Sequence, residues 1–268
     1  MSATPTADQL TLDIASVRPV SFVSLVRVEL RKMADTRAGL WLLISIGLIT
    51  ALVMVIQFWV GLANDLHLTF QDFMIGMNTP MGILLPVLGI LGVTQEWGQR
   101  TALVTFTLVP SRVRVLAAKF VGLLVWAIAA LIVGLALASL SNILFAAMSG
   151  DSAVWGVGIG DLARYLLLHV LGLATGFAFG VLFLNSAVAI VIYFVYSFVL
   201  PGIFAIGAQL MDWFAKVQPW IDFNDAQSVL IGESGVGKQW AHLVVSGLLW
   251  LALPLVVGVW RAVRAEVK

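Results

Sequence analysis

A stretch of 47 residues between Arg164 and Asp212 contains no Asp, Glu, Lys or Arg. As one α-helix it would extend about 70 Å, far more than the roughly 30 Å of hydrocarbon in a bilayer. The stretch must therefore turn back on itself. Asn185-Ser186 offers a turn that divides it into spans of about 162–184 and 187–209, and Pro201-Gly202 is a competing site for a break or kink.

The rest of the chain contains four more apolar segments of this kind. Hydrophobic residues make up 61% of the sequence and charged residues 11%, a composition typical of membrane proteins. A helix needs about 20 apolar residues to cross a bilayer. The four further segments cover residues 39–63, 73–94, 118–141 and 241–260. We therefore predict an all-α polytopic membrane protein with six transmembrane helices.

The distribution of charge along the connecting segments predicts the orientation. Twelve of the 15 basic residues lie before the first span, in the connection between the second and third spans, or after the sixth span. The opposite loops hold three basic residues against eight acidic ones. Because Lys and Arg concentrate in cytoplasmic loops, we expect both termini to be cytoplasmic and the 210–240 loop to be external.

An amphipathic helix is predicted over residues 20–36, immediately before the first span. At 100° per residue Phe22 and Leu30 share an apolar arc, whereas Arg27 lies on the opposite, basic arc, as in a helix that lies in the membrane interface. Glu29 falls inside the apolar arc. An unpaired carboxylate there would be costly, so we expect it to find a basic partner or a protein neighbour.

The sequence GESGVGK has the spacing of a phosphate-binding loop, with glycines at Gly232 and Gly237 and a lysine at Lys238. The preceding AQSVLI could form a strand. However, Gln239 occupies the position that should offer a hydroxyl to Mg²⁺, and a transmembrane segment follows where a soluble α/β domain should be. The predicted external location also excludes cytoplasmic nucleotide. We interpret this stretch as a flexible glycine-rich turn that leads into the sixth span.

Several features together resemble the six-span permease subunits of ABC transporters of the type-two, export-like class. The resemblance covers nearly the whole chain. It is carried by the basic amphipathic helix that ends in ELRKMADTR, by Glu96 and Arg100-Thr101 after the second span, and by the run VPSRVRVLAAK that opens the third span. In that run Pro110 and Arg112 sit where such permeases often have a proline and a basic residue.

The resemblance implies an architecture and a site. Residues 1–18 would be a flexible cytoplasmic N-terminus that is retained, because they lack the apolar core of a cleaved secretory signal. Residues 19–268 would form one transmembrane permease domain. It would include the helix over 20–36, called the elbow, a cytoplasmic coupling segment at 95–117 and an external segment at 210–240 that resembles the family's re-entrant region. The residues expected to contact a separate ATPase through the coupling helix are Glu96, Trp97, Arg100, Thr101, Arg112 and Lys119.

The resemblance also implies a function and partners. The chain would be a subunit of an exporter in the cell membrane for a hydrophobic or amphipathic substrate, embedded in the lipid bilayer. It would work with two cytoplasmic ABC ATPase subunits and a second permease subunit, identical or paralogous. Hydrolysis of Mg-ATP is expected on the ATPase, so this chain would not be an enzyme, would carry no cofactor or metal of its own and would bind no nucleic acid.

Three features inside the spans have two interpretations each. The run of Gly172, Gly176 and Gly180 allows close helix approach, and packing within one subunit is favoured over a dimer seam. Gln57, Tyr193 and Tyr196 could line a substrate path, although lipid contact or ordinary packing is the more common use of such residues. His169 could be a relay residue, but it lies near the outer end of its helix and has no carboxylate partner inside the spans, so snorkelling toward the outer interface is favoured.

Two other functional classes compete with the permease. An ion- or proton-coupled secondary transporter usually retains carboxylates at mid-membrane, and the six predicted spans contain no Asp or Glu there. A membrane enzyme would show a cluster of His, Asp or Ser near one interface, which the sequence lacks. A non-transporting scaffold subunit remains an alternative.

Overall fold

The computed structural model describes residues 20–99, 101, 105, 107–231 and 237–264, and this part of the chain contains helices and no strand. Six helical segments in it are long and apolar enough to cross a membrane, so the predicted count is confirmed and the chain is a multi-pass membrane protein. These six segments are α2 (Arg37–Ala63), α3 (Phe70–Gly98), α5 (Arg112–Ser149), α6 (Ile159–Phe183), Ser186–Leu210 and Gly237–Arg264.

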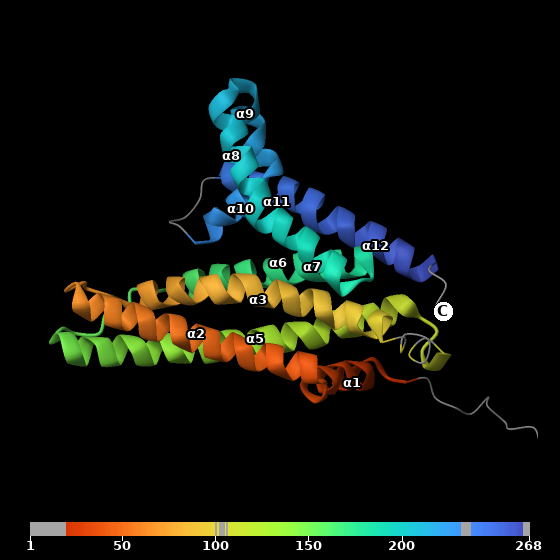
Figure 1. Cartoon of the computed structure of the whole chain (residues 1–268), viewed down its shortest axis with the longest axis horizontal. Coiled ribbons are helices and arrows are strands. Elements are labelled where there is room, and N and C mark those ends of the chain that lie inside the picture. Colours follow the sequence, from red (N-terminus) through yellow and green to blue (C-terminus); the bar gives the residue numbers. More distant parts are fainter. Residues whose placement is uncertain (1–19, 100, 102–104, 106, 232–236, 265–268) are drawn as a thin grey trace, which may run out of the picture.

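The helices α3 and α6 form the centre of the fold. Just over half of the most apolar window of each is buried, 56% in both, against 22% for α2 and 28% for α5. Figure 1 shows α2, α3, α5 and α6 running side by side along the long axis of the molecule. Large side chains at their contacts, such as Phe73, Leu88 and Leu173, are fully buried. The lipid-facing apolar surface therefore belongs mainly to the outer helices.

Glycines allow α3 and α6 to pack in close contact. A Cβ atom on Gly176 would overlap the backbone of Pro86, and one on Gly180 would lie 3.0 Å from the carbonyl oxygen of Ile90. Conversely, a Cβ atom on Gly89 of α3 would overlap the backbone of α6. The glycine face therefore serves packing within the chain, as predicted.

The fifth span begins at the predicted turn. Leu184 has a left-handed φ of 53°, and the Asn185 side chain accepts a hydrogen bond from the backbone N–H of Val188 at 3.1 Å. This is a standard N-cap, which explains why the chain reverses here. Pro201, the competing site, does not end the span.

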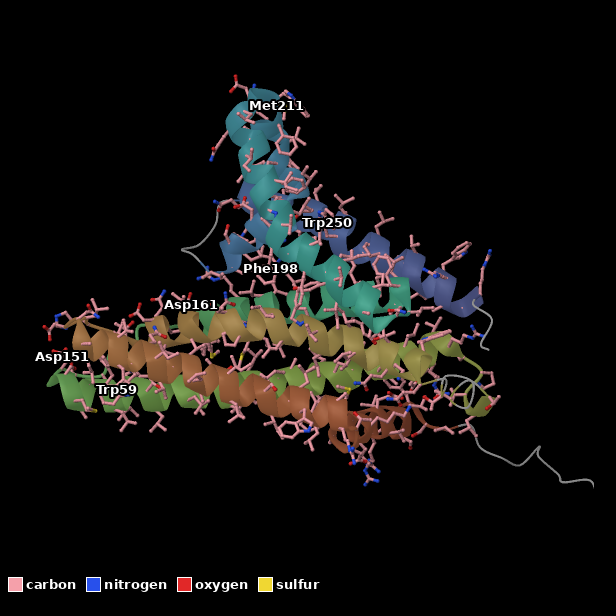
Figure 2. The ribbon with its side chains drawn as sticks, viewed as in Figure 1. Trp59, Asp151, Asp161, Phe198, Met211 and Trp250 are labelled. Carbon is pink, nitrogen blue, oxygen red and sulfur yellow. The ribbon has the colours of Figure 1, made fainter. Side chains whose placement is uncertain are left out.

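The fifth and sixth spans each contain a π-helical turn followed by Leu-Pro. In the fifth span, α7 (Ser186–Phe194) leads into η2 (Val195–Val199) and then α8 (Leu200–Leu210). In the sixth, α11 (Gly237–Gly247) leads into η4 (Leu248–Ala252) and then α12 (Leu253–Arg264). Proline cannot donate the usual helical hydrogen bond, and a wider turn just before it accommodates the missing donor. Figure 2 labels Phe198 in η2 and Trp250 in η4.

Three short helices connect these two spans: α9 (Asp212–Ile221), α10 (Phe223–Ala226) and η3 (Gln227–Leu230). The stretch AQSVLI is thus helical and not a strand, and Lys238 lies in the first turn of α11. Residues 232–236 of the glycine-rich stretch lie outside the described residues. In Figure 1 the α8–α9 hairpin projects away from the four central helices, whereas α10 lies close to them.

The bundle has two chemically distinct ends. The basic end contains Arg112 at the start of α5 and Arg261 near the end of α12, and the acidic end contains Asp65, Asp151 and Asp161. The helix α5 has 38 residues and is therefore about 57 Å long, longer than a bilayer is thick. It continues to Ser149, eight residues beyond the predicted end of the third span at residue 141.

The helix α1 (Phe22–Asp35) lies at the basic end against α5 and α2 (Figure 1). The Ser21 hydroxyl accepts a hydrogen bond from the Ser24 N–H at 3.1 Å and caps its first turn. The Thr36 hydroxyl accepts one from the Gly39 N–H at 3.2 Å, so one threonine separates α1 from α2. The buried residues of α1 are Glu29 and Met33.

Candidate functional site

Four charged side chains form a closed ring at the basic end. Lys119 Nζ lies 2.8 Å from both Glu29 Oε2 and Glu96 Oε1, and Lys32 Nζ lies 2.7 Å from Glu29 Oε1 and 2.6 Å from Glu96 Oε1. Each charge thus touches two opposite charges and the total is neutral. We call Glu29, Lys32, Glu96 and Lys119 the charge ring.

The charge ring joins three helices that are far apart in the sequence. Glu29 and Lys32 come from α1, Glu96 from the last turns of α3, and Lys119 from the second turn of α5. The side chains of Glu29, Glu96 and Lys119 are only 10%, 12% and 4% exposed. The expectation that Glu29 would find a basic partner is confirmed. Because the ring is largely buried, removing one of its charges would leave an opposite charge uncompensated away from water, which is strongly destabilising.

Lys32 is the most exposed member of the charge ring, at 37% of its side chain. Burial on its own lowers the pKa of this ammonium, but hydrogen bonds to the Glu29 and Glu96 carboxylates outweigh it. The pKa of Lys32 consequently lies above its ordinary value of 10.5. Lys32 is therefore a stable cation throughout the physiological range.

Further contacts fix α1 on α5. The indole Nε1–H of Trp126 donates to the carbonyl oxygen of Leu30 at 3.1 Å, and Arg114 Nη2 donates to the carbonyl oxygen of Val20 at 2.7 Å. At the same end, Arg112 Nη1 donates to the carbonyl oxygen of Ala262 at 2.7 Å, which links α5 to α12. The basic end is thus a cross-linked assembly of α1, α3, α5 and α12.

A groove of about 320 Å³ lies beside the charge ring. The ring forms one wall, and Thr36, Gln95, Thr101 and Thr105 contribute to the rest. The amide nitrogen of Gln95 is buried and has no hydrogen-bond partner among the described residues. The groove thus borders the charge ring and the start of the connection between α3 and α5.

The predicted ATPase-contact residues occupy different positions around this groove. Glu96 and Trp97 belong to α3, and Glu96 faces into the charge ring. Thr101 lines the groove, with its N–H bonded to the Glu96 carbonyl oxygen at 3.0 Å. Lys119 is nearly inaccessible inside the ring. Arg100 and residues 102–104 and 106 of the coupling segment lie outside the described residues.

The predicted substrate-path residues separate into two places. Gln57 of α2 donates from Nε2 to the carbonyl oxygen of Asp72 at 2.9 Å and so links α2 to α3. Tyr193 and Tyr196 lie together, with ring centroids 5.9 Å apart, on the wall of a second cavity, which is lined by α3, α6, the fifth span and the α10–η3 segment. The structure therefore groups the tyrosines and leaves Gln57 elsewhere.

The prediction that His169 snorkels is wrong. Its side chain is buried, with 3% of the residue exposed, and its Nδ1 lies 2.9 Å from the Tyr165 carbonyl oxygen. His169 lines the same cavity as the tyrosines, and so do Asn78 and Asn224. The available sequence indication was the presence of polar residues, such as Asn78 and His169, inside otherwise apolar spans. Their convergence depends on which helix faces meet, and that is a property of the tertiary fold.

In the described part of the chain, no group of three or more His, Cys, Asp or Glu side chains could hold a metal ion. The sequence matches no protein-family model and no curated protein. The resemblance to ABC permeases consequently depends only on the sequence features quoted above.

Proposed function

We propose that this chain is the membrane-spanning permease subunit of an ABC transporter of the type-two, export-like class. In this proposal α1 is the elbow helix, the basic end and both termini face the cytoplasm, and the connection between α3 and α5 holds the coupling helix. A separate ATPase hydrolyses Mg-ATP and drives export of a hydrophobic or amphipathic substrate across the cell membrane.

The observation that carries the proposal is the charge ring. An ATPase can do work on the spans only through a contact that is rigidly continuous with them. Glu96 and Lys119 bracket the connection between α3 and α5, and both are held to α1 by buried ion pairs. A push on this connection would therefore move α1, α3 and α5 together.

The ring also suggests that some of the predicted contact residues position the coupling segment and that others contact the ATPase directly. The charges of Glu96 and Lys119 are paired with each other and with residues of α1, so the role of these two residues would be to position the coupling segment. Thr101 and the groove beside it would receive the ATPase. Arg100, by its charge and place in the sequence, would pair with an acidic side chain of the ATPase.

The test is purification of the tagged full chain from its native membrane, followed by identification of the proteins that stay bound. We expect an ATPase with phosphate-binding and Walker B sequences, and ATP hydrolysis by the purified complex. A second permease copy or paralogue should accompany it. If the chain purifies without an ATPase and transports in vesicles that hold only a proton or sodium gradient, it is a secondary transporter and the proposal is wrong.

A matched pair of charge reversals tests the location of the contact. Arg100→Glu should abolish co-purification or uncouple ATP hydrolysis from substrate, because reversal turns an interfacial attraction into repulsion. Arg261→Glu is the control, since Arg261 Nη1 donates to the Leu182 carbonyl oxygen within this chain at 2.9 Å. If Arg261→Glu separates the complex and Arg100→Glu does not, the contact lies on α12.

A further inference from the structure

The helix α1 turns a basic face away from the rest of the chain. At 100° per residue Val23, Arg27, Val28 and Arg31 fall within one arc of about 140°, and all four residues are exposed. Asp35, at the end of the helix, is the acidic residue on this arc. Figure 1 shows α1 on the opposite side of the central helices from the last two spans. We call Val23, Arg27, Val28 and Arg31 the outer face of α1.

The arginines of the outer face have no partner within the described residues. Arg27 and Arg31 form neither a hydrogen bond nor an ion pair there, and the same holds for Arg37, which is exposed at the start of α2. Arg114 adds a fourth guanidinium at the other end of α1, where its Nη2 donates to the Val20 carbonyl oxygen at 2.7 Å. Each unpaired guanidinium keeps five N–H donors and a full positive charge for an anion outside the chain.

The rotation of α1 about its own axis is fixed by buried contacts on its other side. Glu29 pairs with Lys119 of α5 inside the charge ring, and the Leu30 carbonyl oxygen accepts from Trp126 Nε1. Met33 is buried in the hydrophobic core. The apolar arc of α1 is therefore used for packing within the chain. Turning that arc toward lipid would break the charge ring, so the outer face is the side that α1 presents to its surroundings.

The start of α2 marks the level of α1 in the membrane. Thr36 alone separates the two helices, and α2 exposes Leu40 and Trp41 just one turn after Arg37. Trp41 is 65% exposed, and tryptophan concentrates where hydrocarbon meets the headgroups. The apolar outer surface of the first span thus begins at Leu40. It follows that α1 lies at the edge of the hydrocarbon, at the level of the lipid phosphates.

We propose that the outer face of α1 binds the headgroups of anionic phospholipids. Arg27 and Arg31 are four residues apart, so their Cβ atoms lie about 5 to 6 Å from each other and both guanidinium groups can reach one headgroup. Guanidinium matches the geometry of phosphate oxygens. Val23 and Val28 border the arginines and can enter the boundary between headgroups and acyl chains. A zwitterionic lipid offers less, because its own ammonium group compensates the phosphate.

Lipid bound here would act on more than α1. The charge ring ties α1 to the end of α3 and the start of α5, so an anionic lipid that holds α1 in place also stabilises the packing of these three helices. The inference requires only that the basic end lies in a leaflet with anionic lipid. It therefore stands whether or not the chain works with an ATPase.

The experiment measures lipid binding to the purified full chain by native mass spectrometry in a mild, uncharged detergent. One arm titrates phosphatidylglycerol, and the other titrates phosphatidylcholine with the same acyl chains. We expect the first phosphatidylglycerol to bind about tenfold more tightly than the first phosphatidylcholine, because each arginine near the headgroups contributes about a fivefold preference for negative charge. Equal affinities for the two lipids would overturn the proposal.

Matched variants connect the preference to the outer face. The double variant Arg27→Gln/Arg31→Gln should bind both lipids with affinities within about twofold of each other, whereas Arg27→Lys/Arg31→Lys keeps the charges and should retain most of the preference. Lys216→Gln/Lys238→Gln is the control. It removes the same number of exposed charges from α9 and the first turn of α11, and it should behave as the wild type.

Misfolding does not confuse this comparison. None of the four substituted side chains has a partner among the described residues, so all variants should unfold at the wild-type temperature in detergent without added lipid. The proposal is overturned if Arg27→Gln/Arg31→Gln keeps the lipid preference or if the lysine control loses it to the same extent. If the arginine variant keeps the preference and instead loses a co-purifying protein, the outer face of α1 is a protein contact.

Discussion

Gly176 of α6 rests directly on the backbone of Pro86 in α3, with no room for a Cβ atom between them. This contact is the closest approach of the two central helices in the glycine run. It follows that the side chain at position 176 sets the distance between α3 and α6.

Gly176→Ala should therefore destabilise the fold by about 1 to 3 kcal/mol, because the overlapping atom is backbone and cannot rotate away. Gly172→Ala is the matched control on the same helix. Its added Cβ would lie 3.5 Å from Pro86 Cγ, an ordinary contact, and stability should hardly change. Denaturant unfolding in detergent measures both, and equal behaviour of the two variants would contradict the close approach.

Lys119→Met should cost about 3 to 5 kcal/mol, because it leaves Glu29 and Glu96 with one cation between them in a buried site. Asp151→Asn should cost less than about 1 kcal/mol, since the Asp151–His67 pair is largely exposed. Unfolding of the purified chain distinguishes the two.

The double variant Glu29→Gln/Lys119→Met should be more stable than Lys119→Met alone. It keeps the Lys32–Glu96 pair, at 2.6 Å, and restores neutrality. A double variant that is as unstable as the sum of its single changes would show that the four charges do not act as a ring.

The raised pKa of Lys32 predicts a loss of stability at high pH. A cation whose pKa is higher in the folded state than in the unfolded state stabilises the fold fully below the unfolded value. For Lys32 that value is about 10.5, and the contribution is lost as pH rises through the higher folded value. Unfolding of the wild type and Lys32→Met should be compared from pH 9 to 11.5. The difference between them should shrink at the alkaline end, and a constant difference would contradict the raised pKa.

Two tyrosine hydroxyls should respond oppositely to removal. Tyr165→Phe breaks a hydrogen bond between α6 and α3 and should cost about 0.5 to 1.5 kcal/mol. Tyr196→Phe removes a buried hydroxyl that has no hydrogen-bond partner among the described residues, so the variant should be equally stable or slightly more stable. Thermal unfolding measures both, and a larger loss for Tyr196→Phe would mean that its hydroxyl is already paired.

Single cysteines test the orientation, since the chain has no native cysteine. Ser152 lies in the exposed connection between α5 and α6, and Ser111 is exposed just before α5. A cysteine at Ser152 should react with a membrane-impermeant maleimide in intact cells, and one at Ser111 should react only after permeabilisation. The reverse pattern would place the basic end outside.

The spans could be predicted from the sequence because their causes are local. A long run without charge must cross the bilayer, and Asn185 carries its own capping oxygen to the turn. The need of Glu29 for a cation also followed from one helix face. The identity of the partner did not, because Lys119 is 90 residues away and meets it only when α1 packs on α5.

The same reason explains why the predicted position of the His169 side chain was wrong. Its predicted position near the outer end of a span, without a carboxylate partner inside the spans, favoured snorkelling toward water. Its side chain is buried, and the cavity that it lines is completed by α3, the fifth span and the α10–η3 segment, which are distant from it in sequence. When a site is assembled from helices distant in sequence, its only indication in the sequence is the presence of polar residues inside apolar spans.

The charge ring also sets an order of events during synthesis. Glu29 leaves the ribosome 90 residues before Lys119, a delay of about 5 to 18 s at roughly 5 to 20 residues per second. During that delay Lys32 is the nearest cation available to the carboxylate. The nascent α1 must therefore wait at the aqueous surface, and its docking is completed only when the third span has been delivered to the membrane.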